Sequence, residues 1–320
     1  MSNFTEVKSK EILELVLKQM KTAGTNFMTA WVKRGMPRKI TGKPYASMNL
    51  FHLWAKAEQM KYKSNTWATA KHINGLKTAD GKVGLINRGE KATWVVGTFT
   101  TTEKHTLVRG KNKGKVVERD KWSMKFYPVF NLDQTNIEDK NIQFPAGANT
   151  VDSVENYVKN TGADVRISSE NFNPFLSDSC FYSTTGDYIS MVDKSYFKNT
   201  QESSATLNYY SVLLHELTHW TMHKDRCNRS FLEDTKTKDG KFDHKASYAM
   251  EELVAEMGSA IQSCKLGITS KPKIESAQYL NIWINRLENN SDLFWKMCKF
   301  ATQAVWFIEK KQPKKLKKAS

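Results

Sequence analysis

The chain has 320 residues, of which 39% are hydrophobic and 11% aromatic, and its formal net charge is +16. This composition is typical of a globular protein, because disordered chains contain fewer apolar and aromatic residues. The sequence holds no run of about 18 apolar residues, so we expect no membrane-spanning helix and no membrane partner.

Cysteine usage and the N-terminal residues indicate the compartment. Acidic residues and lysines interrupt the apolar positions of the first twenty residues, so the apolar core of a secretion signal is missing. The four cysteines are scattered and include no CxxC pair, which is typical of reduced thiols in a cytosolic protein. We therefore expect a cytoplasmic protein in which any zinc site is built from histidines and carboxylates.

The positive charge is unevenly distributed. Residues 1–140 contain 26 Lys and Arg against 12 Asp and Glu, a net charge of +14, whereas residues 141–309 have a net charge of −4. The last eleven residues contain six lysines and no acidic residue. This asymmetry favours a polyanionic partner for the N-terminal part, with nucleic acid as the first choice; the alternative is a lysine-rich surface that serves solubility.

The N-terminal part is expected to contain helices and a hairpin. Apolar residues at helical spacing predict helices over 6–22 and 48–59, separated by a loop that contains Trp31 and basic residues. From about Lys91 the pattern changes to alternation rich in β-branched residues, with a Gly/Lys-rich turn at 109–115. Two strands on either side of that turn predict a β-hairpin.

The second part is expected to be a separate α+β domain. Short strands are followed by helices over 207–223 and 247–264 and by two more helical segments near 276–287 and 292–309. A polar stretch with a Pro-Ala-Gly interruption places the boundary within 133–150. The predicted organisation is a domain over 1–140, a domain over 141–309 and a disordered lysine-rich tail over 310–320.

The strongest motif is an HExxH sequence, His215-Glu216-Leu217-Thr218-His219. Residues four apart share one helix face, so both imidazoles can bind one metal ion while Glu216 takes a proton from its water. A structural pair of histidines is the alternative. The surrounding segment is strongly apolar, and burying two histidines and a glutamate there is costly unless they have partners.

A catalytic zinc needs a third protein ligand, and the next predicted helix supplies candidates. Glu252 and Glu256 lie four residues apart on one face. We predict Glu252 as the ligand and Glu256 as the carboxylate that orients a ligand imidazole. Glu251 is the main rival, although its position about 100° away favours a solvent-facing side chain. The cofactor is then Zn²⁺, with another divalent metal as the alternative.

The implied chemistry is metal-assisted hydrolysis, in which Glu216 is the catalytic base. The oxyanion needs a donor, and Tyr248 and His223 are candidates. Tyr248 lies one turn before Glu252, and His223 one turn beyond His219. A packed or surface position is the alternative for each.

These segments resemble the ArdC antirestriction family. YYSVLLHELTHWTMHKDRCNR and SYAMEELVAEMGSA resemble the zincin-like metallopeptidase domain of that family, and TGKPYASMNLFHLW, SNTWATAKHING, NRGEKATWVV and YPVFNLDQTNI resemble its single-stranded-DNA-binding domain. The resemblance implies an α/β DNA-binding domain, a gluzincin-type peptidase domain and a plasmid- or phage-borne protein that protects incoming DNA from restriction. An unidentified host protein would be the substrate. The protein would act in the cytoplasm of the host cell, where it could be delivered with the incoming DNA, and the oligomeric state stays open.

Binding of single strands combines phosphate contacts with aromatic faces on which bases stack. Phe51 and Trp54 lie on an apolar helix face and are assigned to the core. Aromatic and basic residues in polar, loop-like surroundings are the predicted DNA contacts: Trp31, Arg34, Arg38, Lys39, Lys43, Tyr45, Trp67, Lys71, Arg88 and Lys91.

Three functions compete. In the first, a DNA-localised zinc peptidase disables a host protein. In the second, the chain only coats single-stranded DNA and its metal site is structural. In the third, it is an accessory of replication or priming on a mobile element.

Overall fold

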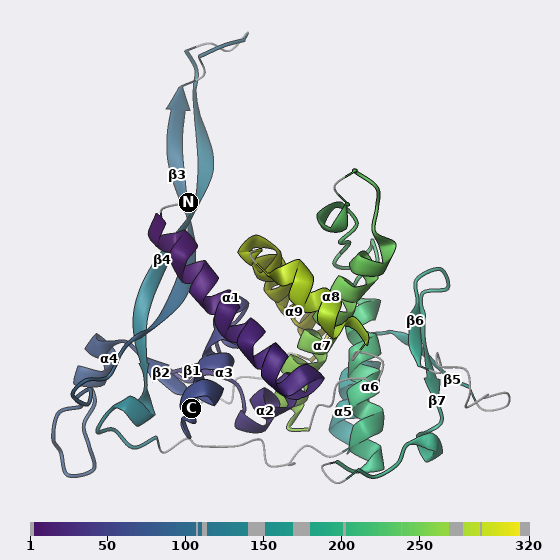
Figure 1. Ribbon diagram of the computed structural model, residues 1–320, viewed down its shortest axis with the longest axis horizontal. Helices are drawn as coiled ribbons and strands as arrows, with labels where there is room; N and C mark the ends of the chain where they lie inside the picture. Colours follow the sequence, from purple (N-terminus) through teal and green to yellow (C-terminus); the bar gives the residue numbers. More distant parts are fainter. Residues whose placement is uncertain are drawn as a thin grey trace.

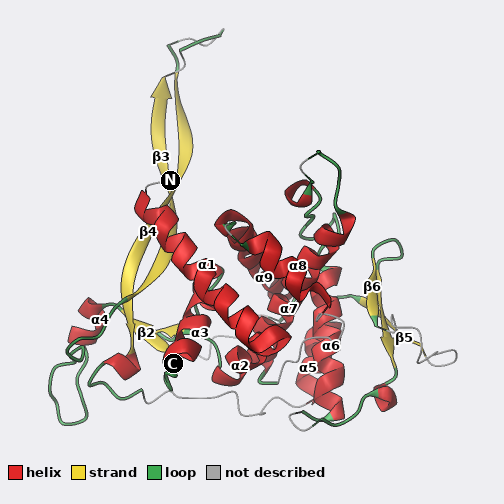
Figure 2. Ribbon diagram, viewed as in Figure 1, coloured by secondary structure: helices red, strands yellow, loops and turns green. Residues whose placement is uncertain are grey.

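The computed structural model describes residues 3–106, 108–110, 114–139, 151–168, 180–200, 203–237, 239–268, 278–288 and 290–313 (Figures 1 and 2). The helices, in chain order, are α1 (Asn3–Ala23), α2 (Phe27–Arg34), α3 (Met48–Met60), α4 (Ala70–Asn74), α5 (Val151–Lys159), α6 (Ala205–Trp220), α7 (His244–Leu266), α8 (Leu280–Leu287) and α9 (Ser291–Lys310). Short 3₁₀ turns occur at Gly24–Asn26, Leu132–Gln134, Lys194–Tyr196 and Glu233–Thr235. The mixed architecture confirms the α+β prediction.

Two sheets lie at opposite ends of the molecule (Figure 2). The first has the order β1-β2-β4-β3 and the second the order β5-β7-β6. β1 is parallel to β2 and β5 to β7, and the remaining pairs are antiparallel. The strands are β1 (Arg38–Lys39), β2 (Thr66–Ala68), β3 (Thr93–Thr106), β4 (Val116–Asn131), β5 (Asp164–Ser168), β6 (Phe181–Ser183) and β7 (Tyr188–Val192).

The predicted hairpin is confirmed and is long. β3 and β4 pair from Thr93↔Val129 to Thr106↔Val116, and their distal half projects away from the helices (Figure 2). Along β3 the buried residues lie at the base, where they include Val95 and Val96. There the side-chain amide of Asn49 donates to the Val96 carbonyl at 2.6 Å and accepts from the Val96 amide at 2.8 Å, so α3 pairs with the edge of β3 as a strand would.

Most predicted helices are confirmed to within a few residues at each end. Two expectations about local structure are wrong. The segment around Trp31 and Arg34 is helix α2 instead of a loop, because its apolar side chains pack into the core shared with α3 and α7. The helix predicted through His223 ends at Trp220. Of the stretch 133–150 in which the boundary was predicted, residues 140–150 lie outside the described residues, as do residues 314–320 of the predicted tail, while α9 continues to Lys310.

The main hydrophobic core joins the two predicted domains. One cluster contains Trp31, Phe51 and Trp54 of the N-terminal part together with Leu253 and Met257 of α7, and α8 and α9 add further side chains. Figure 1 shows α1 lying beside α8 and α9. No helix among the described residues is long and apolar enough to cross a membrane.

Helices α6 and α7 approach each other closely at Gly258. A Cβ at this position would lie 2.4 Å from Cγ2 and 2.8 Å from Oγ1 of Thr218. Beside this contact, Gln262 Nε2 donates to Thr218 Oγ1 at 2.8 Å and to the Leu214 carbonyl at 3.2 Å. A glycine is therefore required for the packing that brings the acidic residues of α7 against the histidines of α6.

Replacing Gly258 by Ala tests this packing. In an exposed helix the change gains about 1 kcal/mol from helix propensity. Here we expect a net loss of free energy of unfolding, because an overpacked core costs about 1–3 kcal/mol. Denaturant unfolding measures the change. Combining Gly258→Ala with Thr218→Ser, which removes Cγ2, should recover part of the loss, whereas a Gly258→Ala protein that is more stable than the native one would contradict the account.

Candidate metal centre

The HExxH residues lie in a helix that begins at a defined cap. The Ser204 hydroxyl accepts from the Leu207 amide, which satisfies a free donor at the first turn of α6. Apolar residues then cover the helix on several sides, so His215, Glu216 and His219 are at most 7% exposed. This burial holds the motif away from bulk water, and residues 215–219 all lie within α6, as predicted.

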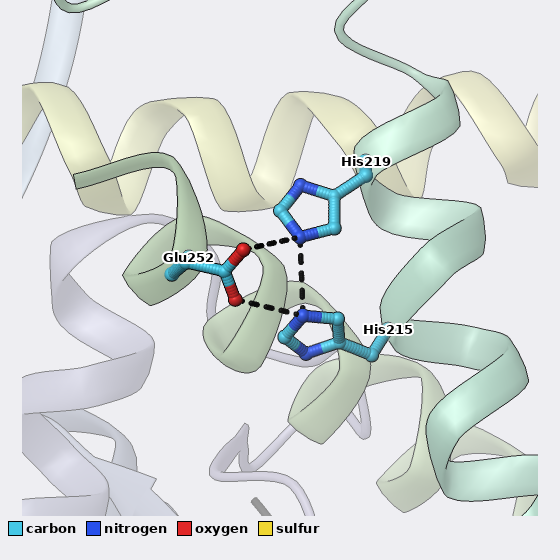
Figure 3. Close-up of side chains that lie close together, drawn as sticks. All are labelled: His215, His219 and Glu252. Atoms are coloured by element: carbon cyan, nitrogen blue, oxygen red, sulfur yellow. Dashed lines mark hydrogen bonds and ion pairs between the residues drawn. The ribbon is translucent and has the colours of Figure 1, made fainter. Parts of the chain in front are cut away.

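Both imidazoles point toward Glu252 on α7 (Figure 3). The Nε2 atoms of His215 and His219 are 3.1 Å apart, and they lie 3.2 and 3.3 Å from the two carboxylate oxygens of Glu252. Ligand atoms at about 2.0–2.1 Å from a tetrahedral ion are about 3.3 Å from one another. These three residues therefore fit one divalent cation and leave a fourth position for a water or a substrate oxygen.

The Nδ1 atoms of the two histidines, which point away from Glu252, also lie close to carboxylates. Nδ1 of His215 lies 3.3 Å from Oε1 of Glu256, and Nδ1 of His219 lies 3.2 Å from Oε1 of Glu251. Glu256 thus stands where the helix spacing placed it. Glu251 can accept the Nδ1 proton of His219, which leaves the Nε2 lone pair of that ring directed at the centre, and Glu256 is the carboxylate nearest to Nδ1 of His215.

Glu251 departs from the expectation of a solvent-facing side chain, since it is only 5% exposed. Arg229, on the segment that follows α6, donates from Nε to Oε2 at 2.7 Å and from Nη2 to Oε1 at 2.5 Å. The same guanidinium donates to Thr221 Oγ1 at 2.8 Å and to the Thr218 carbonyl at 2.9 Å. Arg229 therefore lets a charged Glu251 be buried and ties it to the end of α6.

Electrostatics keep this cluster charged. Burial raises the pKa of the Glu251 carboxyl, but Arg229 outweighs burial and holds that pKa below its usual value. Burial likewise disfavours the charged imidazoles, but Glu256 and Glu252 raise the pKa of His215, and Glu252 with Glu251 raises the pKa of His219 to about 10. A divalent cation would take the place of the ring protons among these carboxylates.

The remaining catalytic candidates are placed differently. Tyr248 is 55% exposed, but its hydroxyl end is turned to Glu252, and burial of that end together with the carboxylate raises its pKa well above the usual value. It therefore stays a hydrogen-bond donor beside the centre. His223 lies beyond the end of α6, where its Nδ1 accepts from the Asp225 amide at 3.3 Å. It does not share the helix face of His219 as expected.

The aromatic residues predicted to contact DNA lie in the core. Trp31 and Trp67 are 1% exposed and Tyr45 is 7% exposed. The Trp31 ring stacks on Trp54 at 5.9 Å, and its Nε1 donates to Gln19. The expectation of polar, loop-like surroundings is wrong for these rings, because apolar side chains from α3 and β3 pack around them, and they offer no free face to a base in this conformation.

The predicted basic contacts divide into two groups. Arg34 is used internally, since its Nε donates to Glu58 at 2.6 Å and its guanidinium bonds to the Tyr62 carbonyl. Arg38 is half-buried on β1. The others are exposed and form no ion pair within the residues that the structure describes: Lys39, Lys43, Lys71, Arg88 and Lys91.

Sequence reasoning missed Arg229 and misplaced Glu251. A signal for Arg229 existed, because a charged residue ten positions after His219 follows an otherwise buried helix. Its partner could not be deduced from helical spacing, since the segment between α6 and Arg229 is irregular.

The Glu251–Arg229 pair supports a testable prediction. In Glu251→Gln the buried Arg229 loses its charged partner and His219 loses its carboxylate. We expect metal affinity to fall about tenfold to a hundredfold and the free energy of unfolding of the metal-free protein to fall by about 3–5 kcal/mol. Competition with a chromogenic chelator measures the first quantity and urea unfolding the second.

Glu256→Gln is the matched control, because it removes the carboxylate beside His215 but leaves the Arg229 pair intact. It should weaken metal binding with a smaller loss of stability. Native metal affinity in Glu251→Gln would contradict a role for this pair in holding His219.

Comparison with known proteins agrees with both halves of the structure. Residues 8–130 match the N-terminal domain of the anti-restriction factor ArdC, and residues 152–298 match a family of zincin-like metallopeptidases. The second range contains the HExxH helix and Glu252. The two matches follow one another in the order that the resemblance of the sequence implied.

Curated relatives include much longer proteins. A DNA primase TraC of Escherichia coli is 28% identical over 301 residues, and a second TraC of that species is 26% identical over 305 residues. These alignments cover 88% and 89% of this chain but only 25% and 18% of the primases, so the chain spans a quarter or less of their length. An uncharacterized protein y4eC of Sinorhizobium fredii is 22% identical over 85% of this chain and 80% of its own length.

Solved structures of similar fold include the antirestriction protein ArdC of plasmid R388. Its metal-free crystal structure has a TM-score of 0.70 and 28% sequence identity, and its Mn(II)-bound structure has a TM-score of 0.67 and 29% identity. Each match covers 95% of this chain and 97% of that protein. In fold and in the order of its two matched regions the chain is therefore ArdC-like: a region that matches the ArdC N-terminal domain precedes a region that matches a zincin-like metallopeptidase family.

Proposed function

We propose that the chain is an antirestriction protein that binds single-stranded DNA and hydrolyses a host protein at a zinc site formed by His215, His219 and Glu252. The observation that carries the proposal is the convergence of both Nε2 atoms and one carboxylate in a buried site whose fourth position is left for a reactant. Zinc is preferred for its tetrahedral two-nitrogen, one-oxygen donor set. The R388 protein was crystallised with Mn(II), so manganese is the alternative.

The roles of the protein groups follow from their places around this site. A bound divalent ion would polarise the scissile carbonyl and acidify the attacking water. Glu216 adjoins His215 on α6, and its carboxylate can accept the proton of that water and pass it to the leaving amine. Tyr248, which is partly exposed and stays protonated, can donate its hydroxyl to the oxyanion.

DNA binding is proposed for the N-terminal part. Its net charge of +14 supports a polyanion as partner, as do the exposed cations that form no ion pair in the described part of the chain, among them Lys39, Lys43, Lys71 and Arg88. The similarity to an ArdC N-terminal domain supports DNA as that polyanion. The protein would act in the cytoplasm of a host cell, encoded by a plasmid or phage and delivered with incoming DNA.

The Glu216→Gln variant distinguishes a protein that hydrolyses a host protein from one that only coats single-stranded DNA. The change keeps the volume of the side chain and removes its base, so we expect proteolysis to fall at least about a hundredfold while metal and DNA binding stay at native levels. Casein cleavage, metal analysis and DNA binding measure the three properties. His215→Ala is the control that should lose the metal as well.

The Glu216→Gln variant also shows whether hydrolysis or DNA coating protects the DNA. We expect the Glu216→Gln variant to give no protection when unmodified DNA is transferred into a restricting host. The measured quantity is the efficiency of that transfer relative to the native protein. Full protection by this variant would show that hydrolysis is not the source of antirestriction, and would leave coating of DNA as the function.

Salt dependence tests the charge argument. Affinity for a single-stranded oligonucleotide should fall steeply as salt rises, with a logarithmic slope of about −0.7 for each phosphate contact. Fluorescence anisotropy between low and moderate salt gives the slope. A flat dependence would mean that the positive charge serves solubility instead.

A role in priming is the second candidate. It is favoured by the relatives named DNA primase TraC, in which the similar region is a small part of a longer protein. In such a role the chain would bind single strands during transfer without cleaving a host protein.

A further inference from the structure

The β3–β4 hairpin leaves one of its faces uncovered just above its base. Residues that pair across two antiparallel strands lie on the same face of the sheet, and so do residues two apart on one strand. Gly97 pairs with Lys125, and Phe99 lies two residues beyond Gly97 on β3. Tyr127 lies two residues beyond Lys125 on β4, so all four share one face, which we call the open face. Phe99 is 43% exposed and Tyr127 is 39% exposed.

The other face of the hairpin packs on the helices at the same level. Val96 and Phe126 pair with each other, are each 9% exposed and belong to the main core. Trp94 and Met124, on the same side of the sheet, pack against that core. This face therefore holds the hairpin to the helices, whereas Phe99 and Tyr127 belong to none of the core clusters formed by the described residues.

Tyr127 is held in place by a glycine on the neighbouring strand. A Cβ at Gly97 would lie 2.6 Å from Cε2 and 3.6 Å from Cζ of Tyr127, so the ring covers a position where no other residue fits. Such a contact stabilises the sheet with one side of the ring. The rest of the ring is open to solvent, and the Lys125 ammonium lies 5.7 Å from its centroid.

The two rings are spaced for bases that are no longer stacked on each other. The ring of Tyr127 reaches the level of Gly97, and Phe99 lies two residues further along β3. Two residues of an antiparallel strand span about 7 Å, which is about twice the 3.4 Å rise between stacked bases. Each ring can therefore take one of two adjacent bases that have been pulled apart, as the bases of a single strand can be and those of a duplex cannot.

The charge of the hairpin favours a polyanion over a neutral partner. Residues 93–131 contain eight Lys and Arg against three acidic residues, a net charge of +5. Lys125 is exposed, lies between the levels of Phe99 and Tyr127, and forms no ion pair within the part of the chain that the structure describes. Aromatic faces combined with cations that follow a phosphate backbone are typical of sites for single-stranded nucleic acid.

We propose that the open face is a stacking platform for two adjacent bases of single-stranded DNA, one on Tyr127 and one on Phe99, with the phosphate between them at Lys125. Stacking tolerates all sequences, because every base has a π face. The inference rests on the proposed binding of DNA. It gives that binding the exposed rings that the buried Trp31 and Trp67 do not supply.

Phe99→Thr is the central test. Threonine favours strands as phenylalanine does, and threonines already stand at 98 and at 100–102, so the hairpin should be retained. Affinity for a labelled strand of about fifteen thymidines, measured by fluorescence anisotropy, should fall at least about fivefold, because a base loses its stacking partner. Phe181→Thr is the matched control: Phe181 is 38% exposed and lies on β6, the edge strand of the other sheet. It should bind DNA as the native protein does.

An abasic strand distinguishes stacking from an effect on the hairpin itself. A strand of the same length without bases keeps its phosphates, so the native protein and Phe99→Thr should bind it equally. Phe99→Trp keeps an aromatic face and should bind the thymidine strand at least as tightly as the native protein does. Equal losses of affinity for both strands in Phe99→Thr would contradict stacking at this position.

Two lysine variants test the place of the phosphate. Lys125→Gln should weaken binding and reduce the logarithmic salt slope by about 0.7, the value for one phosphate contact on a single strand. Lys104 lies on the other face of the same hairpin, opposite Glu118, so Lys104→Gln should leave the slope close to that of the native protein. The same loss of slope in both variants would show that the open face is not the side that binds the phosphate.

Self-association through the open face is the competing use of its apolar rings. Sedimentation should give the native protein and Phe99→Thr the same mass; a native dimer that Phe99→Thr separates would overturn the inference. Equal affinity of the native, Phe99→Thr and Lys125→Gln proteins for the thymidine strand would also overturn it, and would leave DNA binding to other parts of the chain. A native chain that binds no single-stranded DNA at all instead defeats the proposed function itself.

Discussion

The close packing of α6 on α7 is the constraint on which the metal centre depends. Only a glycine at position 258 lets the helices approach to this distance, and Gln262 ties the contact by donating to Thr218 and Leu214. At this separation the carboxylate of Glu252 reaches both imidazoles of the HExxH motif. A wider spacing would leave two buried histidines without their third partner, which is a costly arrangement in an apolar interior.

Around this centre the protein surrounds three candidate ligands with groups that fix their protonation and orientation. Glu251 forms a hydrogen bond with Nδ1 of His219, Glu256 lies 3.3 Å from Nδ1 of His215, and Arg229 makes the burial of Glu251 tolerable. Because Arg229 also bonds to the Thr218 carbonyl and to Thr221, the irregular segment after α6 is part of the site. The shared core extends this packing into the N-terminal part, so that the basic region and the metal centre belong to one packed body.

Sequence reasoning found what depends on local periodicity. The spacing of His215 and His219 and of Glu252 and Glu256 defined their helix faces, and the alternation from about Lys91 onward identified the hairpin. Local periodicity cannot predict which side chains from distant parts of the sequence contact one another. Trp31 stands in a polar stretch of sequence but is covered by α3, Glu251 is covered by Arg229, and the ring of Tyr127 covers Gly97 on the other strand of the hairpin.

The central claim is that one divalent ion is held by both Nε2 atoms of the HExxH histidines and by Glu252. A crystal structure of the zinc-loaded protein, with anomalous data at the zinc edge, tests it most directly. The account predicts one peak about 2.0–2.2 Å from these three ligands, with the fourth position open to water. A peak bound through Glu251 in place of Glu252, or no ordered ion between α6 and α7, would contradict it.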